Sequence, residues 1–364
     1  MRVMITGGGT GGHTSPAVAI IEELRRRDPK LLLQWVGRHG GFESRVCVQQ
    51  DIPFRGLPVE GWPRKQAWRK PWVAAKLVWC MLRAALLLRA FRPQVVIGVG
   101  GYVSLPAMWT AQRMGIPTVL HEQNKRLGMA NRLAAPRAER VFLSYEDTIG
   151  NLPDTGVSLV GNPVRPGFVA PPSTESAREA FSLDPAKPVL FVCGGSQGAR
   201  SINKAVTEML PVLAPNEFQL MWMTGPADLE KAREAVQNAP VDAQVFPYIE
   251  DMAAACVAAS LVVSRAGAST TAELTALGKP ALLIPYPYAT DNHQEQNARA
   301  LEAGGAAHVL LDQHCDGSAL CAEVRDLLGD AKALAIMAAA AKSLGKLAAA
   351  ELIAESIMEL VFPV

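Results

Sequence analysis

The chain opens with MRVMITGGGTGGH at residues 1–13, and a second glycine-rich segment, FVCGGSQGAR, stands at residues 191–200. In both segments an apolar run typical of a buried strand leads into glycines and then into a helix-like stretch. Glycine lets a backbone approach an oxyanion closely, and the helix N-terminus behind it supplies free N–H groups and the positive end of the helix dipole. Two such loops, one in each half of the chain, predict two phosphate-binding α/β domains.

Short apolar runs bounded by glycine or proline alternate with helical stretches along the whole chain. In the first half they predict strands at 2–6, 31–36, 94–99, 117–121 and 140–144. After a proline-rich segment at 161–174, which we interpret as a linker, further strands are predicted at 188–192, 218–223, 244–246, 260–264, 281–285 and 307–311. This alternation predicts parallel sheets with crossover helices, whose ligands bind beyond the carboxyl ends of the strands.

The composition is that of a globular protein with two cores. The 364 residues are 49% hydrophobic and 19% charged, which is enough apolar material for two domains of ordinary size. The net charge is only +2, but residues 1–164 carry 22 Lys and Arg against 11 Asp and Glu. We therefore expect the basic first half to meet an anionic partner.

The cysteines and the N-terminus argue against an exported protein. Six cysteines are scattered without a C-x-x-C pair, and no His cluster has metal-ligand spacing, so we expect buried thiols in a reducing compartment and no metal site. The chain passes from Met1 and Arg2 directly into the first predicted strand, which leaves no room for a signal peptide. Lys and Arg interrupt every long apolar stretch, so no membrane-spanning helix is expected.

The first loop fits two nucleotide-binding motifs imperfectly. Its glycines have the G-x-G-x-x-G spacing of the dinucleotide fingerprint, but Arg38 stands where an acidic residue would hold the ribose. This argues against NAD and leaves only an NADP interpretation. The loop also approaches the P-loop pattern, but His13 replaces the lysine that grips the phosphates. A kinase or ATPase is therefore not expected.

Two segments of the second half suit a nucleotide sugar. SRAGASTTAE at 264–273 places small residues and hydroxyls after a predicted strand, so its backbone N–H groups can hold phosphate and Glu273 can reach ribose hydroxyls. The alternative is that Thr270 and Glu273 form only a capping box. DNHQEQN at 291–297 gathers amide and acid groups of the kind that bind sugar hydroxyls.

Six short segments, spread over both predicted domains, carry a family resemblance. They are GGTGGH at 8–13, GGYVS at 100–104, HEQN at 121–124, GNPVR at 161–165, GGSQGA at 194–199 and RAGA at 265–268. In this order they resemble the MurG family of bacterial undecaprenyldiphospho-muramoylpentapeptide N-acetylglucosaminyltransferases, glycosyltransferase family 28. A nucleotide-sugar enzyme of the same fold, such as a UDP-N-acetylglucosamine 2-epimerase, is the alternative.

The resemblance implies the α/β GT-B architecture, in which two Rossmann-like domains have parallel sheets that face an interdomain cleft. We expect residues 1–163 to form the acceptor-binding and membrane-associating domain. Residues 164–345 would form the UDP-sugar-binding domain, and a C-terminal helix at 346–364 would pack back on the first domain.

The resemblance also implies a reaction and its partners. N-acetylglucosamine would move with inversion from UDP-N-acetylglucosamine (UDP-GlcNAc) to the muramoyl 4-hydroxyl of the undecaprenyl-linked lipid I, which gives lipid II for peptidoglycan synthesis. The protein would be peripheral on the cytoplasmic side of the cell membrane, would need no cofactor, and would have other cell-wall synthesis proteins as candidate partners. The donor contacts implied are Thr10, Gly11, Gly12, Asn124, Arg165, Ser196, the backbone of Ile249, Ala268, Ser269, Thr270, Thr271, Ala272, Glu273 and Gln294.

An inverting transfer needs a base for the acceptor hydroxyl and stabilisation of the leaving diphosphate. No Asp-x-Asp occurs in the chain, so a metal bridge is unsupported and helix N-termini are expected to neutralise the leaving UDP. His13 is one candidate base, because a histidine side chain ordinarily titrates near neutrality. Its alternative role is to orient phosphate or backbone. Glu122, in the HEQN segment, is the rival base, and we expect His121 to be structural.

Residues 61–92 combine basic and tryptophan side chains without an acidic residue. The basic residues are Arg64, Lys65, Arg69, Lys70, Lys76, Arg83, Arg89 and Arg92, and the tryptophans are Trp62, Trp68, Trp72 and Trp79. This combination suits an anionic membrane surface. The alternative is a crossover helix buried on its sheet with solvated charges on one side, and both can hold for different faces. No nucleic-acid partner is expected, because no DNA- or RNA-binding module is recognisable.

Overall fold

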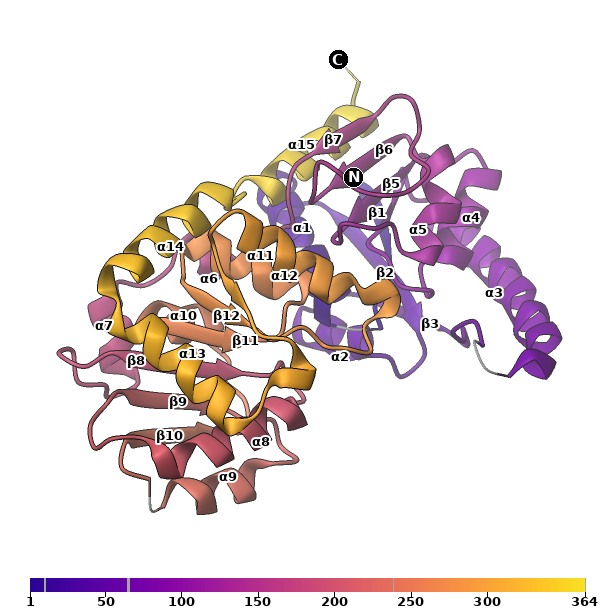
Figure 1. The fold of residues 1–364 in the computed structure, drawn as a ribbon. Helices are drawn as coiled ribbons and strands as arrows, with labels where there is room; N and C mark the ends of the chain where they lie inside the picture. The colour runs from indigo at the N-terminus through magenta and orange to yellow at the C-terminus, as the bar shows by residue number, and fades with distance from the viewer. Residues whose placement is uncertain (10, 64–65, 238, 364) are drawn as a thin grey trace. The chain divides into compact units, whose positions relative to one another are not determined.

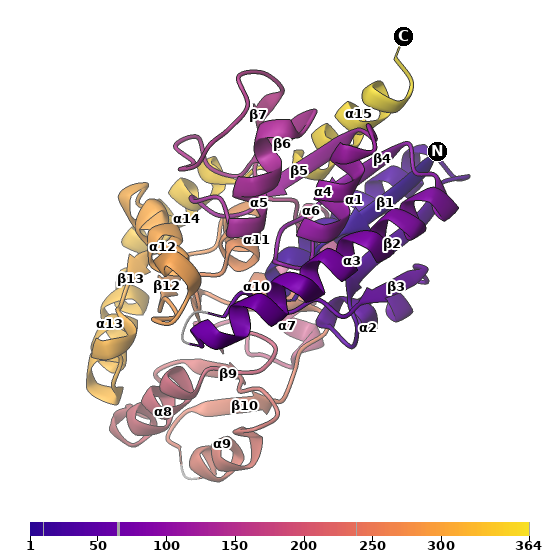
Figure 2. The same cartoon turned by 90° about the vertical axis from the view of Figure 1, so that its right-hand side faces the viewer.

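The computed structural model describes residues 1–9, 11–63, 66–237 and 239–363 (Figures 1 and 2). The chain forms two compact units, Met1–Arg165 with Lys346–Val364, and Pro166–Gly345. The second unit is thus built from a continuous segment, and the first is completed by the C-terminus of the chain.

The first unit holds a parallel sheet of seven strands in the order β3-β2-β1-β4-β5-β6-β7. The strands are β1 (Arg2–Thr6), β2 (Leu32–Arg38), β3 (Phe54–Leu57), β4 (Val95–Gly98), β5 (Thr118–Glu122), β6 (Arg140–Leu143) and β7 (Val157–Leu159). The helices are α1 (Gly11–Arg27), α2 (Phe42–Gln49), α3 (Lys70–Phe91), α4 (Leu105–Arg113), α5 (Met129–Ala134) and α15 (Ala349–Val361), with 3₁₀ turns η1 (Ala67–Arg69) and η2 (Ala135–Arg137).

The second unit repeats this order with a parallel sheet of six strands, β10-β9-β8-β11-β12-β13. The strands are β8 (Val189–Cys193), β9 (Gln219–Met223), β10 (Asp242–Phe246), β11 (Leu261–Ser264), β12 (Ala281–Leu283) and β13 (His308–Val309). The helices are α6 (Pro166–Val169), α7 (Thr174–Ala180), α8 (Arg200–Met209), α9 (Leu229–Val236), α10 (Met252–Ala258), α11 (Ala268–Leu277), α12 (His293–Ala303), α13 (Gly317–Gly329) and α14 (Ala331–Leu344). The 3₁₀ turns are η3 (Leu210–Val212), η4 (Thr290–Asn292) and η5 (Asp312–His314).

All eleven strands predicted from the sequence are confirmed, and the described residues form two further strands that were not predicted. β3 contains Arg55 and Gly56, and the three residues of β7 are all exposed. Both strands lie at the edges of the first sheet, where each pairs with only one other strand. An edge strand that is not buried on both faces lacks the continuous apolar run that marks the inner strands of a parallel sheet.

Each face of the first sheet is covered by its own set of helices. Val3 and Ile5 of β1 pack with α1, α2 and α15 on one face, whereas Met4 packs with α3 and α4 on the other. α15 contributes Ile353, Ala354 and Ile357 to the first of these cores. The C-terminal helix is therefore an integral part of the first unit.

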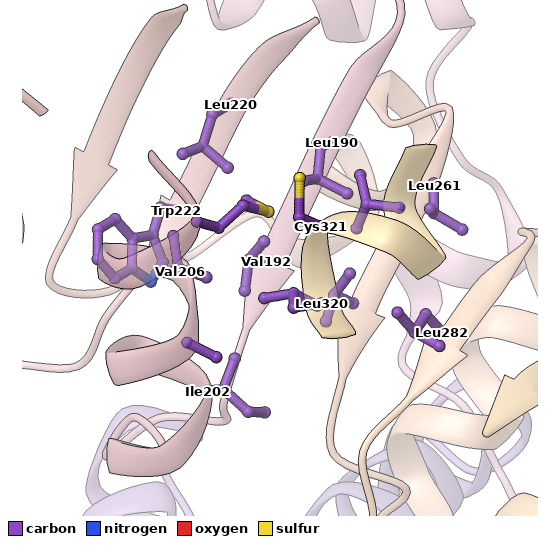
Figure 3. Packing of buried hydrophobic residues seen from close by; sticks show 14 of the residues in the cluster. Leu190, Val192, Ile202, Val206, Leu220, Trp222, Leu261, Leu282, Leu320 and Cys321 are labelled. Carbon is purple, nitrogen blue, oxygen red and sulfur yellow. The ribbon is translucent and has the colours of Figure 1, made fainter. Parts of the chain in front are cut away.

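In the second unit, α8 and α13 cover one face of the sheet. Figure 3 shows side chains of β8, β9, β11 and β12 meeting side chains from these two helices. Trp222 of β9 is fully buried there, and its indole N–H donates to Asn203 Oδ1 at 3.1 Å. Burying a large apolar side chain stabilises a fold by roughly 1.5–3 kcal/mol. Such contacts hold the carboxyl ends of the strands in place.

Two helical stretches, Lys70–Phe91 and Ala331–Val361, have the length and composition of a membrane span. The second comprises two helices, α14 and α15, which belong to different units. The first is α3, whose Val73, Cys80, Ala84 and Leu88 are buried. A helix packed on its own protein along one face is not surrounded by lipid, so neither stretch is interpreted as a span.

Candidate active site

The first glycine loop joins β1 to α1 at the point where the strand order reverses between β1 and β4. Residues 7–9 all have positive φ, which favours glycine. A Cβ on Gly7 would lie 2.6 Å from Val99 Cγ2, and one on Gly101 would lie 2.4 Å from Gly8 O. The loops after β1 and β4 thus pack backbone against backbone.

The donor contacts predicted in the first part of the chain lie beyond the carboxyl ends of its strands. Gly11 and Gly12 form the first turn of α1, where the helix dipole is positive. Asn124 follows β5, and Arg165 ends the first long segment of the unit. Thr10 lies outside the described residues.

A buried carboxylate, Glu43, stands behind the first loop. Its Oε2 accepts the N–H of Gly9 at 2.9 Å, and its Oε1 accepts the N–H of Arg38 at 2.6 Å. The chain approaches it closely, because a Cβ on Gly8 or Gly37 would come within 2.5 or 2.6 Å of Glu43 atoms. One N–H of the glycine loop therefore points to a carboxylate of the protein itself.

His13 lies in the first turn of α1 and is connected to β5 by hydrogen bonds. Its Nδ1 is 2.9 Å from Gln123 Oε1, and Gln123 Nε2 is 3.0 Å from His121 Nδ1 and 2.9 Å from the carbonyl of Val99. His121 Nε2 lies 3.1 Å from the carbonyl of Gly161. Burial lowers the pKa of His121 to about 4, so this side chain is neutral near pH 7.

Glu122, the rival candidate base, is buried and fully hydrogen-bonded. Its Oε1 accepts the backbone N–H of Asn124 at 3.0 Å and the Asn124 Nδ2 at 3.1 Å. Its Oε2 accepts the N–H of Gly128 at 2.9 Å and Asn131 Nδ2 at 2.8 Å. These bonds tie residues 124–131 to the end of β5.

The second glycine loop joins β8 to α8 at the corresponding reversal of strand order, between β8 and β11. Gly195 and Gly198 have φ of 93° and 77°, and the N–H of Gly198 donates to Gly195 O at 2.9 Å. A Cβ on Gly198 would lie 1.9 Å from Thr224 O, so this loop packs against backbone with no space for a side chain. Ser196 is exposed at the tip of the loop.

The N-terminus of α11 tests whether Thr270 and Glu273 form a capping box. The N-cap is Gly267, and the helix begins at Ala268. Thr270 is therefore the third helical residue, so the alternative that Thr270 and Glu273 form a capping box is wrong. Glu273 is buried in the second turn. The helix begins three residues earlier than a capping box would require because the glycine supplies the extended N-cap conformation.

Other predicted donor residues of the second unit already serve local contacts. Thr271 Oγ1 donates to Ala268 O at 3.0 Å, and Gln294 Oε1 accepts the N–H of Tyr286 at 2.9 Å. The N–H of Ile249 lies 3.3 Å from Met223 Sδ. Among the described residues, no three His, Cys, Asp or Glu side chains gather as metal ligands would.

Arg265 connects three loops beyond the carboxyl ends of the second sheet. Its Nη1 donates to Asp312 Oδ1 at 2.6 Å and to the carbonyls of Ile284 and Pro285 at 3.1 and 3.2 Å. Its Nη2 donates to Ser201 Oγ, in the first turn of α8, at 2.8 Å. One half-buried guanidinium thus holds the loops after β11, β12 and β13 to the start of α8.

The outer face of α3 is apolar and exposed, whereas its inner face is buried on the sheet. The exposed side chains include Trp72 and Trp79, with relative exposures of 65% and 53%, and Leu82 and Leu86. The crossover-helix interpretation therefore holds for the inner face, whereas membrane binding by the outer face stays a prediction. Arg64 and Lys65 lie outside the described residues.

Arg69, Lys76 and Arg83 follow one another at helical spacing from the N-cap of α3 onward and form a basic stripe, which the nearby Glu60 partly neutralises. Glu60 accepts Arg69 Nη2 at 3.0 Å and also accepts Lys76 Nζ, which lowers the pKa of the Glu60 carboxyl. Arg83 lies over the Trp79 ring, 5.9 Å from its centroid. Two of the three stripe cations, Arg69 and Lys76, are therefore paired within the protein.

Comparison with known proteins identifies the family. A Listeria welshimeri protein named UDP-N-acetylglucosamine--N-acetylmuramyl-(pentapeptide) pyrophosphoryl-undecaprenol N-acetylglucosamine transferase is 38% identical over 360 residues, 98% of this chain and 99% of the relative. The family 28 N-terminal domain matches residues 3–143, and the C-terminal domain matches residues 189–356. The chain belongs to glycosyltransferase family 28. A Desulforamulus reducens relative with the same printed name is 40% identical over 95% of both chains.

Solved structures agree with membership of family 28. The crystal structure of Acinetobacter baumannii MurG superposes with a TM-score of 0.80 at 28% identity, covering 98% of this chain and 99% of that one. The predicted GT-B class, with two Rossmann-like α/β domains, is confirmed. A UDP-GlcNAc 2-epimerase from Neisseria meningitidis covers 99% of this chain at a TM-score of 0.69, but at 15% identity this likeness concerns the fold alone.

Two structural features of this family 28 chain were not predicted from its sequence. Arg265 was noticed as part of a motif, but its bonds to Asp312 and Ser201 were not foreseen, because those partners lie in distant segments. Glu43 was not singled out at all. Its only sequence signal is the neighbouring cluster of glycines at 37–41, which leaves room for a buried carboxylate.

Proposed function

We propose that this chain transfers N-acetylglucosamine, with inversion, from UDP-GlcNAc to the muramoyl 4-hydroxyl of lipid I, giving lipid II for peptidoglycan synthesis. The observation that carries the proposal is identity of 38% over 98% of the chain to proteins named for this transfer. The epimerase alternative is not favoured, because it rests on likeness in fold alone.

We propose that the second unit binds the donor. α8 and α11 begin directly after glycine-containing loops at the carboxyl ends of β8 and β11, so their dipoles can stabilise the negative charge of the leaving UDP. The proposed contacts there are Ser196, the backbone of Ile249, residues 268–273 and Gln294. Gly11, Gly12, Asn124 and Arg165 of the first unit complete the proposed set.

His13 is the general base in this proposal. It would accept the proton of the acceptor hydroxyl while that oxygen attacks C1 of the sugar and UDP departs. In its favour, His13 is only half-buried and stands beside the first glycine loop. Glu122 is a less suitable base, because accepting a proton would weaken four hydrogen bonds that hold residues 124–131.

The proposal includes peripheral binding to the cytoplasmic side of the membrane through the exposed face of α3. Its support is the exposed Trp72, Trp79, Leu82 and Leu86, with cations of α3 that Glu60 does not pair, such as Lys70 and Arg89. Tryptophan and basic residues together favour an anionic interface. Association with other cell-wall synthesis proteins stays a prediction.

A transfer assay tests the proposed activity. Labelled UDP-GlcNAc is incubated with the protein, with and without a lipid I analogue, and the lipid and aqueous products are separated. We expect label in the lipid product only when the acceptor is present. Isomerised sugar or UDP release without acceptor would instead identify an epimerase, and no turnover in either arm would contradict an enzymatic function.

A further inference from the structure

The hydrogen bonds around His121 determine which of its nitrogens carries the proton. Its Nε2 lies 3.1 Å from the carbonyl of Gly161, and a carbonyl oxygen only accepts, so Nε2 carries the hydrogen. The side chain is buried and neutral, so Nδ1 holds a lone pair. The second contact of Nε2 agrees with a protonated Nε2. The Ser144 hydroxyl, 3.5 Å away, donates its own hydrogen to Glu122 O, so its oxygen can accept from Nε2. His121 thus presents an acceptor to Gln123.

The orientation of the Gln123 amide follows from this. Its Nε2 has two hydrogens, and it faces three acceptors, Val99 O at 2.9 Å, His121 Nδ1 at 3.0 Å and His121 O at 3.3 Å. The flipped amide would place an oxygen against all three acceptors, and His121 Nδ1 and Val99 O would lose this hydrogen-bond donor in a buried site. Gln123 is itself buried, so water does not offer an alternative partner. The amide oxygen must therefore point toward His13.

We propose that Gln123 is a positioning residue that holds His13 in the Nδ1–H tautomer and so presents the Nε2 lone pair as the base. The Oε1 of Gln123 is 2.9 Å from His13 Nδ1, and an amide oxygen only accepts, so the hydrogen lies on Nδ1. The inference rests on the proposed function of His13. It concerns a property of the free protein, which is measurable without turnover.

The backbone beside the ring supports the same geometry. A Cβ on Gly100 would lie 3.0 Å from His13 Nδ1 and 3.4 Å from Gln123 Oε1, so the glycine leaves space for the bonded pair. With the ring held there, the proton balance of transfer is complete. The acceptor O–H bond breaks as an Nε2–H bond forms, the oxygen pair bonds to C1, and UDP takes the C1–O electron pair. Gln123 keeps its bond to Nδ1–H throughout and takes no proton.

Nitrogen NMR of the wild-type protein labelled with ¹⁵N-histidine tests the tautomer directly. Long-range ¹H–¹⁵N correlations above pH 8 distinguish a protonated ring nitrogen from one with a lone pair, and the spectrum of His13→Ala assigns the His13 signals among the six histidines. We expect Nδ1–H for His13 and Nε2–H for His121. An Nε2–H tautomer for His13 would overturn the proposal, even if the transfer assay succeeds.

A variant tests whether the tautomer matters for the reaction. Gln123→Met keeps a similar side-chain length and removes the amide, so we expect mixed His13 tautomers and a fall in kcat of at least tenfold, with the KM for UDP-GlcNAc changed less than twofold. Normal kcat with mixed tautomers would overturn the positioning role. Should this variant fail to fold, the wild-type spectrum still decides the tautomer. A failed transfer assay with the expected spectrum would overturn only the proposed function.

Discussion

The two glycine loops occupy the same position in two sheets of the same strand order, yet they are supported differently. The first is backed by the buried carboxylate of Glu43, which accepts the Gly9 N–H, and is followed directly by His13. The second packs on the backbone of Thr224 and is held by Arg265 through Ser201. An equivalent position in the fold therefore does not imply an equivalent ligand. In our proposal the first loop carries the base, and the second belongs to the diphosphate site.

Among the tests of this difference between the loops, replacing His13 by Ala has the largest expected effect. We expect kcat to fall by about 10²-fold or more, the usual scale of general-base catalysis. The KM for UDP-GlcNAc should stay nearly unchanged, because the first loop is not the main donor site. Steady-state kinetics measure both values, with His39→Ala as a matched control on an exposed histidine of the same unit. A raised KM for UDP-GlcNAc with normal kcat would instead place His13 in the donor site and remove it as the base.

Acid should lower the free energy of unfolding, because His121 is buried in the first unit. Its folded-state pKa is about 4, below the ordinary value of 6.5, so the unfolded chain binds the proton first as the pH falls. The stabilisation is complete above pH 6.5 and decreases toward pH 4, by roughly 3 kcal/mol in all. Urea unfolding followed by a probe of the first unit, at pH 7 and pH 4.5, measures it. The same pH dependence in His121→Gln would show that another group is responsible.

The next largest effect on stability is expected from replacing Glu43, the buried carboxylate behind the first loop. In Glu43→Gln an amide NH₂ replaces one of the two oxygens, so the N–H of Gly9 or of Arg38 loses its acceptor in a closely packed site. We expect a loss of about 2 kcal/mol in the free energy of unfolding. Urea denaturation measures it, with the exposed Glu355→Gln as the control. Equal stability of the two variants would contradict a supporting role for Glu43.

The smallest expected effect concerns the exposed face of α3, which belongs to the unit that carries the first loop. Trp72 and Trp79 are partly exposed, so changing both to Ser should weaken vesicle binding by about tenfold, or ~1.4 kcal/mol. Co-sedimentation with anionic and neutral vesicles measures the binding, and Val212→Ser, an exposed residue of the second unit, is the control. Equal binding of the wild type to both kinds of vesicle would remove the electrostatic part of the proposal.

Much of the fold was predictable because its signals are local. The inner strands are continuous apolar runs bounded by glycine or proline, so the sequence predicted them, whereas the edge strands β3 and β7 lack that run. The glycines of both loops likewise reveal positive φ and close backbone approach without knowledge of the partners. Helix starts were less readable, as the N-cap of α11 at Gly267 shows.

The sequence by itself determined the two α/β domains, the family and the positions of the glycine loops at the strand ends. Only the tertiary structure decided the partners of the polar groups there. His13 meets Gln123 across 110 residues of sequence, Arg265 meets Asp312 across 47, and Gly9 meets Glu43 across 34. Backbone preference and hydrophobic pattern act over a few neighbouring residues, so they can be read along the chain. Hydrogen bonds between loops form only when the ends of two strands lie side by side. The crossover helices place the strand ends in this way, so such neighbours exist only in the folded protein.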